Sequence, residues 1–415
     1  MKVAYFSPLP PERSGIADYS VLLLPALERR FNVTVVRRGR RRTLRGTDLA
    51  LYHVGNNPDA HGWIVEALRR RRGLVVLHEF VLHHLVAGLT VGRGDREGYL
   101  DAMQREAGPV GRMLAHGVID GLVPPLWEVR PHDFPLAGPV LSLAGGLIVH
   151  SRYVEEQARA VGFLGPIWRI PHPAWPNSVP APDPEVLGHG SPLIGCVGNI
   201  VPAKRIGQLL VAFTRLRRSV PGAVLVLAGS VGGVQIQPRL EQLQLRAGED
   251  VIVLGHVEEE RLWAVLAACD ICVSLRSPTM GETSGSVIRS LGLGRPVVVS
   301  DVGWFSELPD EVVAKIPVDE SEVDVLAGVL ERLSADDELR ERMGGAARRY
   351  VRRDHDLDHV ADLYQRACDE YLAGPAVDAE VLGEVSRAAH EVGIGMNDAE
   401  FRELAGRLRE TDLVR

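Results

Sequence analysis

Lysine and cysteine are scarce in this chain of 415 residues, and long apolar runs are missing. The only lysines are Lys2, Lys204 and Lys315, although Lys and Arg together number 47, so a lysine in a loop stands out. No apolar run approaches the roughly 18–20 residues of a membrane-spanning helix, and the N-terminus lacks the charged-then-apolar layout of a signal peptide. We therefore expect a cytoplasmic protein.

The four cysteines are too few and too scattered to form a disulfide framework. Cys269 and Cys272 form C-x-x-C, but neither a second Cys pair nor a nearby His completes a zinc site, so we interpret both as small core residues. The segment H-E-x-x-x-H-H that starts at His78 lacks the i, i+4 histidine spacing of a helical zinc site. No metal is predicted.

Composition indicates a globular chain with more than one domain. With 46% hydrophobic and 24% charged residues, 415 residues suffice for two domains of ordinary size, each with its own core. We find no internal repeat and no low-complexity segment.

The formal net charge of −7 is unevenly distributed. Residues 1–75 hold fourteen Lys and Arg against six Asp and Glu, partly in an arginine run from Arg37 to Arg45. This run fits contact with anionic phospholipid or a polyprenyl-phosphate acceptor at the inner face of a membrane, and equally an ordinary solvated surface. Nucleic acid is not expected as a partner, because no recognisable binding motif accompanies the charge.

The order of apolar runs predicts two α/β domains. Expected strands occupy residues 3–10, 33–36, 49–55, 74–80, 147–151 and 167–173, and then 193–198, 223–230, 251–257, 271–275, 297–300 and 313–318. Helical patterns between them are typical of parallel sheets covered on both faces. Residues 93–139 break this rhythm and are expected to form an insertion. Seven prolines between Pro171 and Pro192 predict a linker.

Residues 276–301 (RSPTMGETSGSVIRSLGLGRPVVVSD) are expected to form a strand end, a polar loop, a helix and the next strand. The loop brings five residues to the N-terminus of that helix: Thr283, Ser284, Gly285, Ser286 and Val287. Free amides and the helix dipole favour a phosphate there, and Gly285 lets one approach closely. Glu282 is the one charge in the loop and would repel a lone phosphate, so sugar hydroxyls are a plausible partner for it.

This stretch resembles the donor-site signature of the retaining, two-domain (GT-B) glycosyltransferases of family 4. That family shows a Pro, a Glu-Gly-Phe-Gly-like turn, a second Glu eight positions after the first, and Gly-x-Pro-Val. Glu282 matches the first Glu, which the resemblance implies holds donor-sugar hydroxyls. Ser290 stands at the second position, so the usual ribose clamp is shortened to a hydroxyl or lost.

A second match lies in LIGCVGNIVPAKR, where the family has Gly-Arg-x4-Lys-Gly and its Arg and Lys clamp the donor diphosphate. Lys204 matches the Lys, whereas Asn199 replaces the Arg and Arg205 replaces the Gly. An ammonium near a diphosphate offsets charge that develops as the glycosidic bond breaks. Loss of the Arg should weaken this clamp unless Arg205 or Arg276 substitutes for it.

Three further residues follow from the resemblance. Gly15 lies in the N-terminal loop that the family places across the interdomain cleft, and His78 matches the strand-end His that contacts the donor sugar. His256 lies in the LGHV segment, which the family places against the nucleotide base. These residues complete the predicted donor site.

The resemblance implies an α/β chain with the GT-B fold, in which two Rossmann-like, doubly wound parallel-sheet domains face a cleft. We expect an acceptor-side domain at residues 1–172, a Pro-rich linker at 173–191 and a donor domain at 192–355. A helix at 356–375 is expected to cross back onto the first domain, followed by a helical extension at 376–415.

We expect transfer of a sugar from a nucleotide-sugar donor to an acceptor hydroxyl, with a glycan, a lipid-linked or a small-molecule acceptor. Glu282 is the one carboxylate placed near the donor, and the resemblance puts it on sugar hydroxyls, which leaves same-face transfer with retention. No Asp-x-Asp stands at a strand end, so neither cofactor nor metal is expected. The alternatives are a GT-B enzyme that does not transfer sugar, such as a nucleotide-sugar epimerase, and a non-catalytic nucleotide-sugar-binding protein.

Overall fold

The computed structural model describes residues 1–12, 14–39, 46–175 and 180–391, with side chains described as far as residue 374. Arg40, Arg41, Arg42 and Arg45 of the predicted basic run lie outside the described residues, as do residues 392–415 of the predicted extension. Within the described ranges, we find no helix that has both the length and the apolar character of a membrane span.

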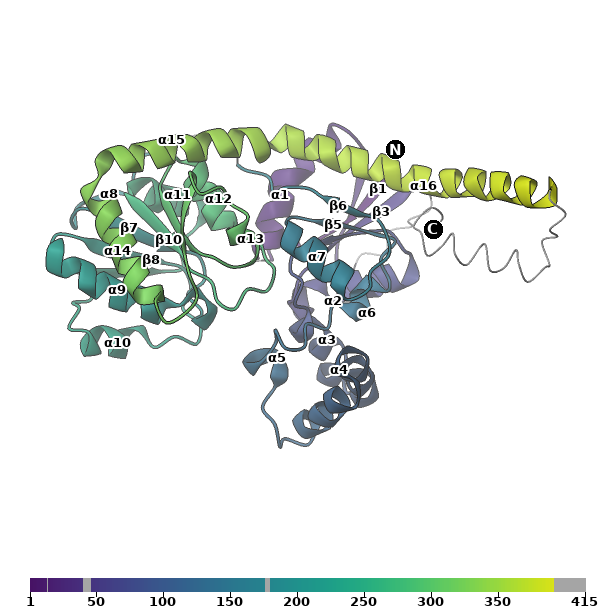
Figure 1. The fold of residues 1–415 in the computed structure, drawn as a ribbon, viewed down its shortest axis with the longest axis horizontal. Coiled ribbons are helices and arrows are strands. Elements are labelled where there is room, and N and C mark those ends of the chain that lie inside the picture. The colour runs from purple at the N-terminus through teal and green to yellow at the C-terminus, as the bar shows by residue number, and fades with distance from the viewer. Residues whose placement is uncertain (13, 40–45, 176–179, 392–415) are drawn as a thin grey trace. The chain divides into compact units, whose positions relative to one another are not determined.

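The chain divides into two units (Figure 1). Unit 1 comprises Met1–His150, Glu155–Ile170 and the chain from Ala361 onward, and unit 2 comprises Ser151–Val154 and Pro171–Val360. Each unit contains a six-stranded sheet in which all neighbouring strands run parallel. The predicted α/β class with two doubly wound parallel sheets is therefore confirmed.

The sheet of unit 1 has the order β2-β1-β3-β4-β5-β6. Its strands are β1 (Lys2–Phe6), β2 (Asn32–Val36), β3 (Leu49–Val54), β4 (Leu74–Leu77), β5 (Gly146–Val149) and β6 (Ile167–Arg169). The helices of this part of the chain are α1 (Gly15–Glu28), α2 (Pro58–Arg70), α6 (Gly138–Leu141), α7 (Arg152–Ala160) and α16 (Leu357–Glu391). Because the chain order reverses between β1 and β3, this is the flavodoxin-like type of doubly wound sheet.

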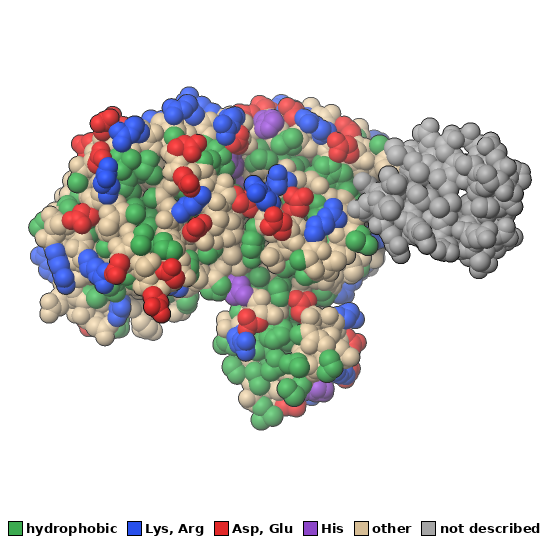
Figure 2. All heavy atoms as spheres, viewed as in Figure 1, with side chains coloured by type: hydrophobic (Ala, Val, Ile, Leu, Met, Phe, Trp, Pro, Cys, Tyr) green, Lys and Arg blue, Asp and Glu red, His purple; other side chains and the backbone are tan. Residues whose placement is uncertain are grey.

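The predicted insertion forms a helical lobe within unit 1. The lobe begins before the predicted residues 93–139, with α3 (His83–Leu89) and the 3-10 turn η1 (Val91–Arg93), and continues with α4 (Arg96–Ile119) and α5 (Leu126–Val129). Non-helical backbone at Ala107 and Gly108, just before Pro109, kinks α4. Apolar side chains gather on the surface of this lobe, where Met113 and Leu122 are 65% and 82% exposed (Figure 2).

The sheet of unit 2 has the order β12-β11-β10-β7-β8-β9. Its strands are β7 (Leu193–Val197), β8 (Val224–Ala228), β9 (Val251–Gly255), β10 (Ile271–Ser274), β11 (Val297–Ser300) and β12 (Val313–Ile316). Its other elements are α8 (Pro184–Leu187), η2 (Pro202–Lys204), α9 (Ile206–Ser219), α10 (Ile236–Gln242), α11 (Glu259–Ala268), α12 (Gly285–Gly292), α13 (Gly303–Ser306), α14 (Glu322–Ala335) and α15 (Asp337–Asp354). This is the strand order of the Rossmann fold, with its switch point between β7 and β10.

Two apolar clusters, one on each face of the unit 2 sheet, form its core. α9 and α14 pack on one face, while α11, α12 and α15 contribute to the cluster on the other. Cys196, Cys269 and Cys272 are buried in these clusters as free thiols, which confirms their interpretation as core residues.

Candidate functional site

Lys204, Glu282 and residues 283–287 of the predicted donor site follow the carboxyl ends of β7 and β10, the switch point of the unit 2 sheet. These two strands pair directly, with Ile271 opposite Ile194 and Cys272 opposite Gly195. Ligands of open α/β sheets bind in the crevice that such a reversal creates. The loops after the two strands are also joined, because the Ser277 amide donates to the Ala203 carbonyl at 2.8 Å.

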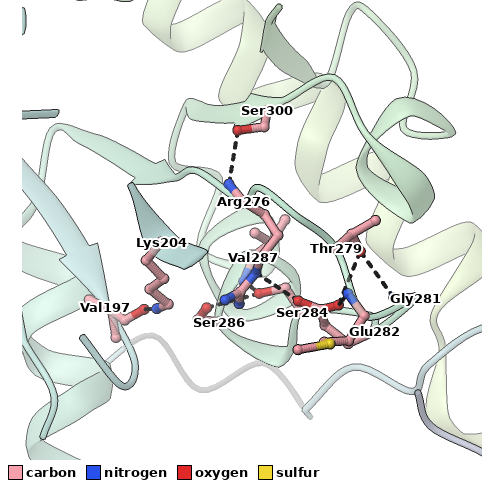
Figure 3. A network of polar contacts seen from close by, with 11 residues as sticks. Val197, Lys204, Arg276, Thr279, Gly281, Glu282, Ser284, Ser286, Val287 and Ser300 are labelled. Carbon is pink, nitrogen blue, oxygen red and sulfur yellow. Dashed lines mark hydrogen bonds and ion pairs between the residues drawn. The ribbon is translucent and has the colours of Figure 1, made fainter. Parts of the chain in front are cut away.

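Lys204 ends the short η2 turn after β7 and is 5% exposed. Its ammonium donates to the carbonyl of Val197, the last residue of β7 (Figure 3). Gly198 has a φ of +96°, and a Cβ there would lie 2.8 Å from the Lys204 Nζ, so only glycine lets the ammonium come this close. Burial lowers the pKa of Lys204 to about 8; among the smaller effects, Cys196 and Glu282 raise this pKa and Arg276 lowers it.

Glu282 lies on the loop after β10, and two hydrogen-bond donors and one cation hold its carboxylate. The Met280 amide donates to Oε2 at 2.7 Å and the Thr279 hydroxyl at 3.1 Å, while Arg276 Nε forms an ion pair with Oε1 at 2.7 Å. Both charged side chains are largely buried, at 14% and 18% exposure. The carboxylate is therefore fixed beside the start of α12, within the group shown in Figure 3.

The N-terminus of α12 comes shortly after Glu282 in the chain and presents hydroxyl groups and backbone amides. Ser284 caps the helix by accepting from the Val287 amide at 3.3 Å, and its Oγ lies 3.0 Å from that of Ser286. Among the described residues, Thr283 Oγ1 is buried without a hydrogen-bond partner. The N-terminus of α12, the hydroxyls of Ser284 and Ser286 and the Lys204 ammonium together form a region that suits an anion. The Glu282 carboxylate lies beside it.

Other predicted donor residues are arranged differently. Arg205 is engaged by Glu322 of α14, with Nε 2.5 Å from Oε1. Ser290 is buried, and its hydroxyl donates back to the Ser286 carbonyl of its own helix at 2.9 Å. Asn199 is exposed, and the half-exposed His256 lies 3.5 Å from Glu258.

The cavities of unit 2 do not reveal this site by size. A cavity of about 440 Å³ lies along α9, with Val234 and Val323 in its wall, and none of the predicted donor residues lines it. Ser286, Val287 and Ser290 line a cavity of only about 10 Å³ beneath α12. The chemistry of the loops is therefore the stronger indication of function.

Gly15 and His78 belong to unit 1. Gly15 is the first residue of α1, where Ser14 caps the helix by accepting from the Ala17 amide at 3.1 Å. His78 follows β4 and is buried, and its Nε2 lies 3.0 Å from Nδ1 of His53 in β3.

The H-E-x-x-x-H-H segment does not converge on one point. His83 Nε2 lies 2.9 Å from the Tyr99 hydroxyl in the core of the helical lobe, and His84 is exposed. Within the described residues, we find no cluster of three or more His, Cys, Asp or Glu that could hold a metal ion.

Sequence reasoning missed the partners of two predicted residues, Glu282 in unit 2 and His78 in unit 1. Arg276 was considered only as a substitute for the missing arginine, although its place directly after a central strand could have indicated a site residue. His53 lies inside an apolar strand, where a histidine suggests only a core position. Its pairing with His78 required the register of β3 and β4, in which His53 lies opposite Val76.

The comparisons with known proteins cover mainly unit 2. Residues 181–350 match the family model described as glycosyl transferases group 1. A Mycolicibacterium smegmatis protein named GDP-mannose-dependent alpha-(1-6)-phosphatidylinositol monomannoside mannosyltransferase is 29% identical over 48% of this chain and 56% of its own length. A Nocardia farcinica D-inositol 3-phosphate glycosyltransferase is 32% identical over 38% of this chain and 36% of its own length. The chain thus spans about half or less of these relatives.

Solved structures extend the likeness to both units. Sucrose-phosphate synthase from Thermosynechococcus elongatus has a TM-score of 0.61 at 17% identity, over 90% of this chain and 99% of its own. Anabaena HepE in complex with UDP-glucose has a TM-score of 0.60 at 13% identity, over 89% and 100%. At such identities the likeness shows the fold alone. Residues 181–350 therefore belong to the group 1 glycosyl transferases, within a chain that has the GT-B fold.

Proposed function

We propose that this protein is a glycosyltransferase that moves a sugar from a nucleotide-sugar donor to an acceptor hydroxyl, with retention of anomeric configuration and without a metal ion. The observation that carries this proposal is the arrangement of Lys204 and Glu282 beside the N-terminus of α12, at the Rossmann switch point of unit 2. A cation and a helix N-terminus suit a diphosphate, and a fixed carboxylate suits sugar hydroxyls.

In this proposal Lys204 and the first amides of α12 bind the diphosphate of the donor. Charge grows on that diphosphate as the glycosidic bond breaks, so cations placed there beforehand stabilise the transition state more than the ground state. Glu282 orients the sugar through its hydroxyls, because the Met280 amide and the Thr279 hydroxyl hold one side of the carboxylate.

Retention follows from what surrounds the donor site. Inversion needs a general base beside the acceptor, and double displacement needs a carboxylate free to attack the anomeric carbon. Glu282 is held by two hydrogen-bond donors and an ion pair with Arg276, which favours a positioning role over nucleophilic attack. The remaining route is transfer on one face, in which the leaving phosphate accepts the acceptor's proton while Lys204 and the helix amides stabilise it.

The acceptor is proposed only as a hydroxyl compound. The relatives' names include phosphatidylinositol monomannoside, D-inositol 3-phosphate and, for a protein from Mycobacterium tuberculosis, glycogen, so lipid-linked, small-molecule and glycan acceptors all stay candidates. We place His78 of unit 1 on the donor sugar. The arginine run from Arg37 to Arg45 is proposed to contact anionic lipid, which vesicle co-sedimentation at low and high salt would test.

The deciding experiment is incubation with a panel of nucleotide sugars and acceptors of these three classes, followed by NMR of the anomeric proton. We expect a product with the donor's anomeric configuration, formed equally in the presence of EDTA. An inverted linkage would falsify the retaining mechanism, and loss of activity in EDTA would contradict metal independence.

The same panel separates the alternative functions. A nucleotide-sugar epimerase would change the donor's sugar without an acceptor. A non-catalytic binding protein would bind donors and release no product, an alternative favoured by exposed Asn199 and by the inward hydroxyl of Ser290.

A further inference from the structure

A diphosphate carries more than one negative charge, whereas Lys204 supplies one positive charge. We propose that Arg276 is the second cation of the diphosphate site, and that its ion pair with Glu282 is exchanged for the diphosphate when the donor binds. This inference rests on the proposed function and adds to it the residue that completes charge compensation.

Arg205, which follows Lys204 directly, is not available for this role. Its guanidinium contacts both carboxylate oxygens of Glu322, whose side chain is only 2% exposed. Withdrawing Arg205 would leave a buried carboxylate without its cation, which is strongly destabilising. We therefore assign Arg205 to the stability of the contact between the Lys204 loop and α14.

Arg276 is anchored at the switch point. Its own amide donates to Ser300 Oγ of β11 at 2.8 Å, and the amide of the next residue, Ser277, donates to Ala203 at 2.8 Å. The main chain of Arg276 is thus tied to the turn that carries Lys204. In Figure 3 its side chain runs toward Ser286 at the start of α12, the residue that also lies near Lys204.

The contacts of Glu282 permit the exchange. Its Oε2 is held by the Met280 amide and the Thr279 hydroxyl, whereas Arg276 approaches Oε1. When Arg276 turns to the diphosphate, Oε2 keeps both donors and Oε1 becomes available for a sugar hydroxyl. A guanidinium binds two phosphate oxygens in parallel, so it orients the diphosphate as well as neutralising it. Arg276 and Glu282 thus neutralise each other in the absence of donor. When the donor binds, its diphosphate becomes the partner of Arg276 and its sugar hydroxyl becomes the partner of Glu282.

Isothermal titration of the full chain with UDP, GDP and the nucleosides uridine and guanosine tests this role. We expect Arg276→Ala to weaken binding of the better diphosphate by about 10- to 100-fold, the value of a charge-assisted hydrogen bond, and to leave nucleoside affinity within about twofold. The diphosphate affinity of Arg276→Lys should lie between those of the wild-type protein and Arg276→Ala. The control is Arg332→Ala, which removes an exposed arginine of α14 that pairs with Asp336 and should change neither affinity.

The outcomes are distinguishable. Unchanged diphosphate affinity in Arg276→Ala, or equal loss for nucleoside and diphosphate, would overturn the role of Arg276 and leave the proposed function standing. A wild-type protein that binds no diphosphate would overturn the proposed function itself. The double variant Asn199→Arg, Arg276→Ala returns a guanidinium to the exposed position on the Lys204 loop, and we expect it to recover at least about threefold in affinity; no recovery would contradict a charge role.

Discussion

The carboxyl ends of the central strands differ sharply in charge between the two units. In unit 2 they hold Lys204, Arg276 and Glu282, three charged groups packed against each other with little solvent. In unit 1 the corresponding ends hold His53 and His78 in direct contact. Two sheets of the same doubly wound class thus differ in the chemistry of a few loop and strand-end residues.

In unit 1, burial favours the neutral forms of the His53, His61 and Tyr19 side chains. It lowers the pKa of His53 well below its ordinary value, with a further effect of His150, and lowers the pKa of His61 to about 4. It also raises the pKa of Tyr19, whose ring lies 4.8 Å from that of His78. These buried rings form a neutral, aromatic core at the ends of the unit 1 strands, whereas the edge of unit 2 carries charges that suit a diphosphate. Four predictions follow from this contrast.

Removing the buried cation of unit 2 should have the largest effect. Lys204→Ala should lower kcat/KM by about 10²–10³, as loss of one preorganised electrostatic partner does. Lys204→Arg should restore only part of this loss, because the larger planar head does not fit the space beside Gly198. Steady-state kinetics would measure both, with Lys315→Ala, a lysine on β12 paired with Asp310, as the matched control. Unchanged kinetics in Lys204→Ala would sink the assignment.

Glu282→Gln should separate binding from turnover. The amide keeps the shape of the side chain but removes the charge that accepts donor-sugar hydroxyls, so we expect kcat to fall by about 10- to 100-fold. Affinity for the nucleoside diphosphate should not fall, because the diphosphate does not contact Glu282 and Arg276 no longer has to leave an ion pair to bind it. Titration with UDP or GDP beside turnover measurements checks both, and equal loss of affinity and kcat would argue for a structural role.

Much of this arrangement was predictable from local sequence. Alternating apolar runs and turn residues predicted the parallel sheets, and Lys204 and Glu282 stand at strand ends, which parallel sheets bring to one edge. The pairing of Arg205 with Glu322 was not predictable, because 117 residues separate the two and a charge on a helix suggests a solvated surface. Ser290 illustrates a further limit: a serine inside a helix either faces a ligand or bonds back to its own backbone, and only the coordinates decide between them.

The decline of activity at alkaline pH should reflect deprotonation of Lys204. Because burial lowers its pKa to about 8, diphosphate affinity should fall up to about tenfold per pH unit above pH 8. The fold itself gains stability there, since between pH 8 and the ordinary lysine pKa the unfolded chain binds the proton that the folded chain has lost. Two results together would establish that Lys204 causes the decline: diphosphate affinity falls above pH 8 while the protein stays folded, and diphosphate affinity does not change with pH in Lys204→Arg. A decline that persists in Lys204→Arg would assign it to another group.

The fourth prediction concerns the stability of unit 1 at low pH. His61 Nδ1 bonds the His53 carbonyl at 3.1 Å, and burial lowers the His61 pKa to about 4. Between the ordinary histidine pKa and pH 4, the unfolded chain binds a proton at His61 that the folded chain does not bind. The free energy of unfolding therefore falls by about 3 kcal/mol for this group as the pH decreases through that range.

We expect amide-exchange protection of α2 and β3 to fall between pH 7 and 5 while that of β7 and β10 changes less. His61→Asn can keep a donor to the same carbonyl without titrating and should flatten the response, whereas His84→Asn, at an exposed position on α3, should not. Equal acid loss in both units would contradict the contrast in charge.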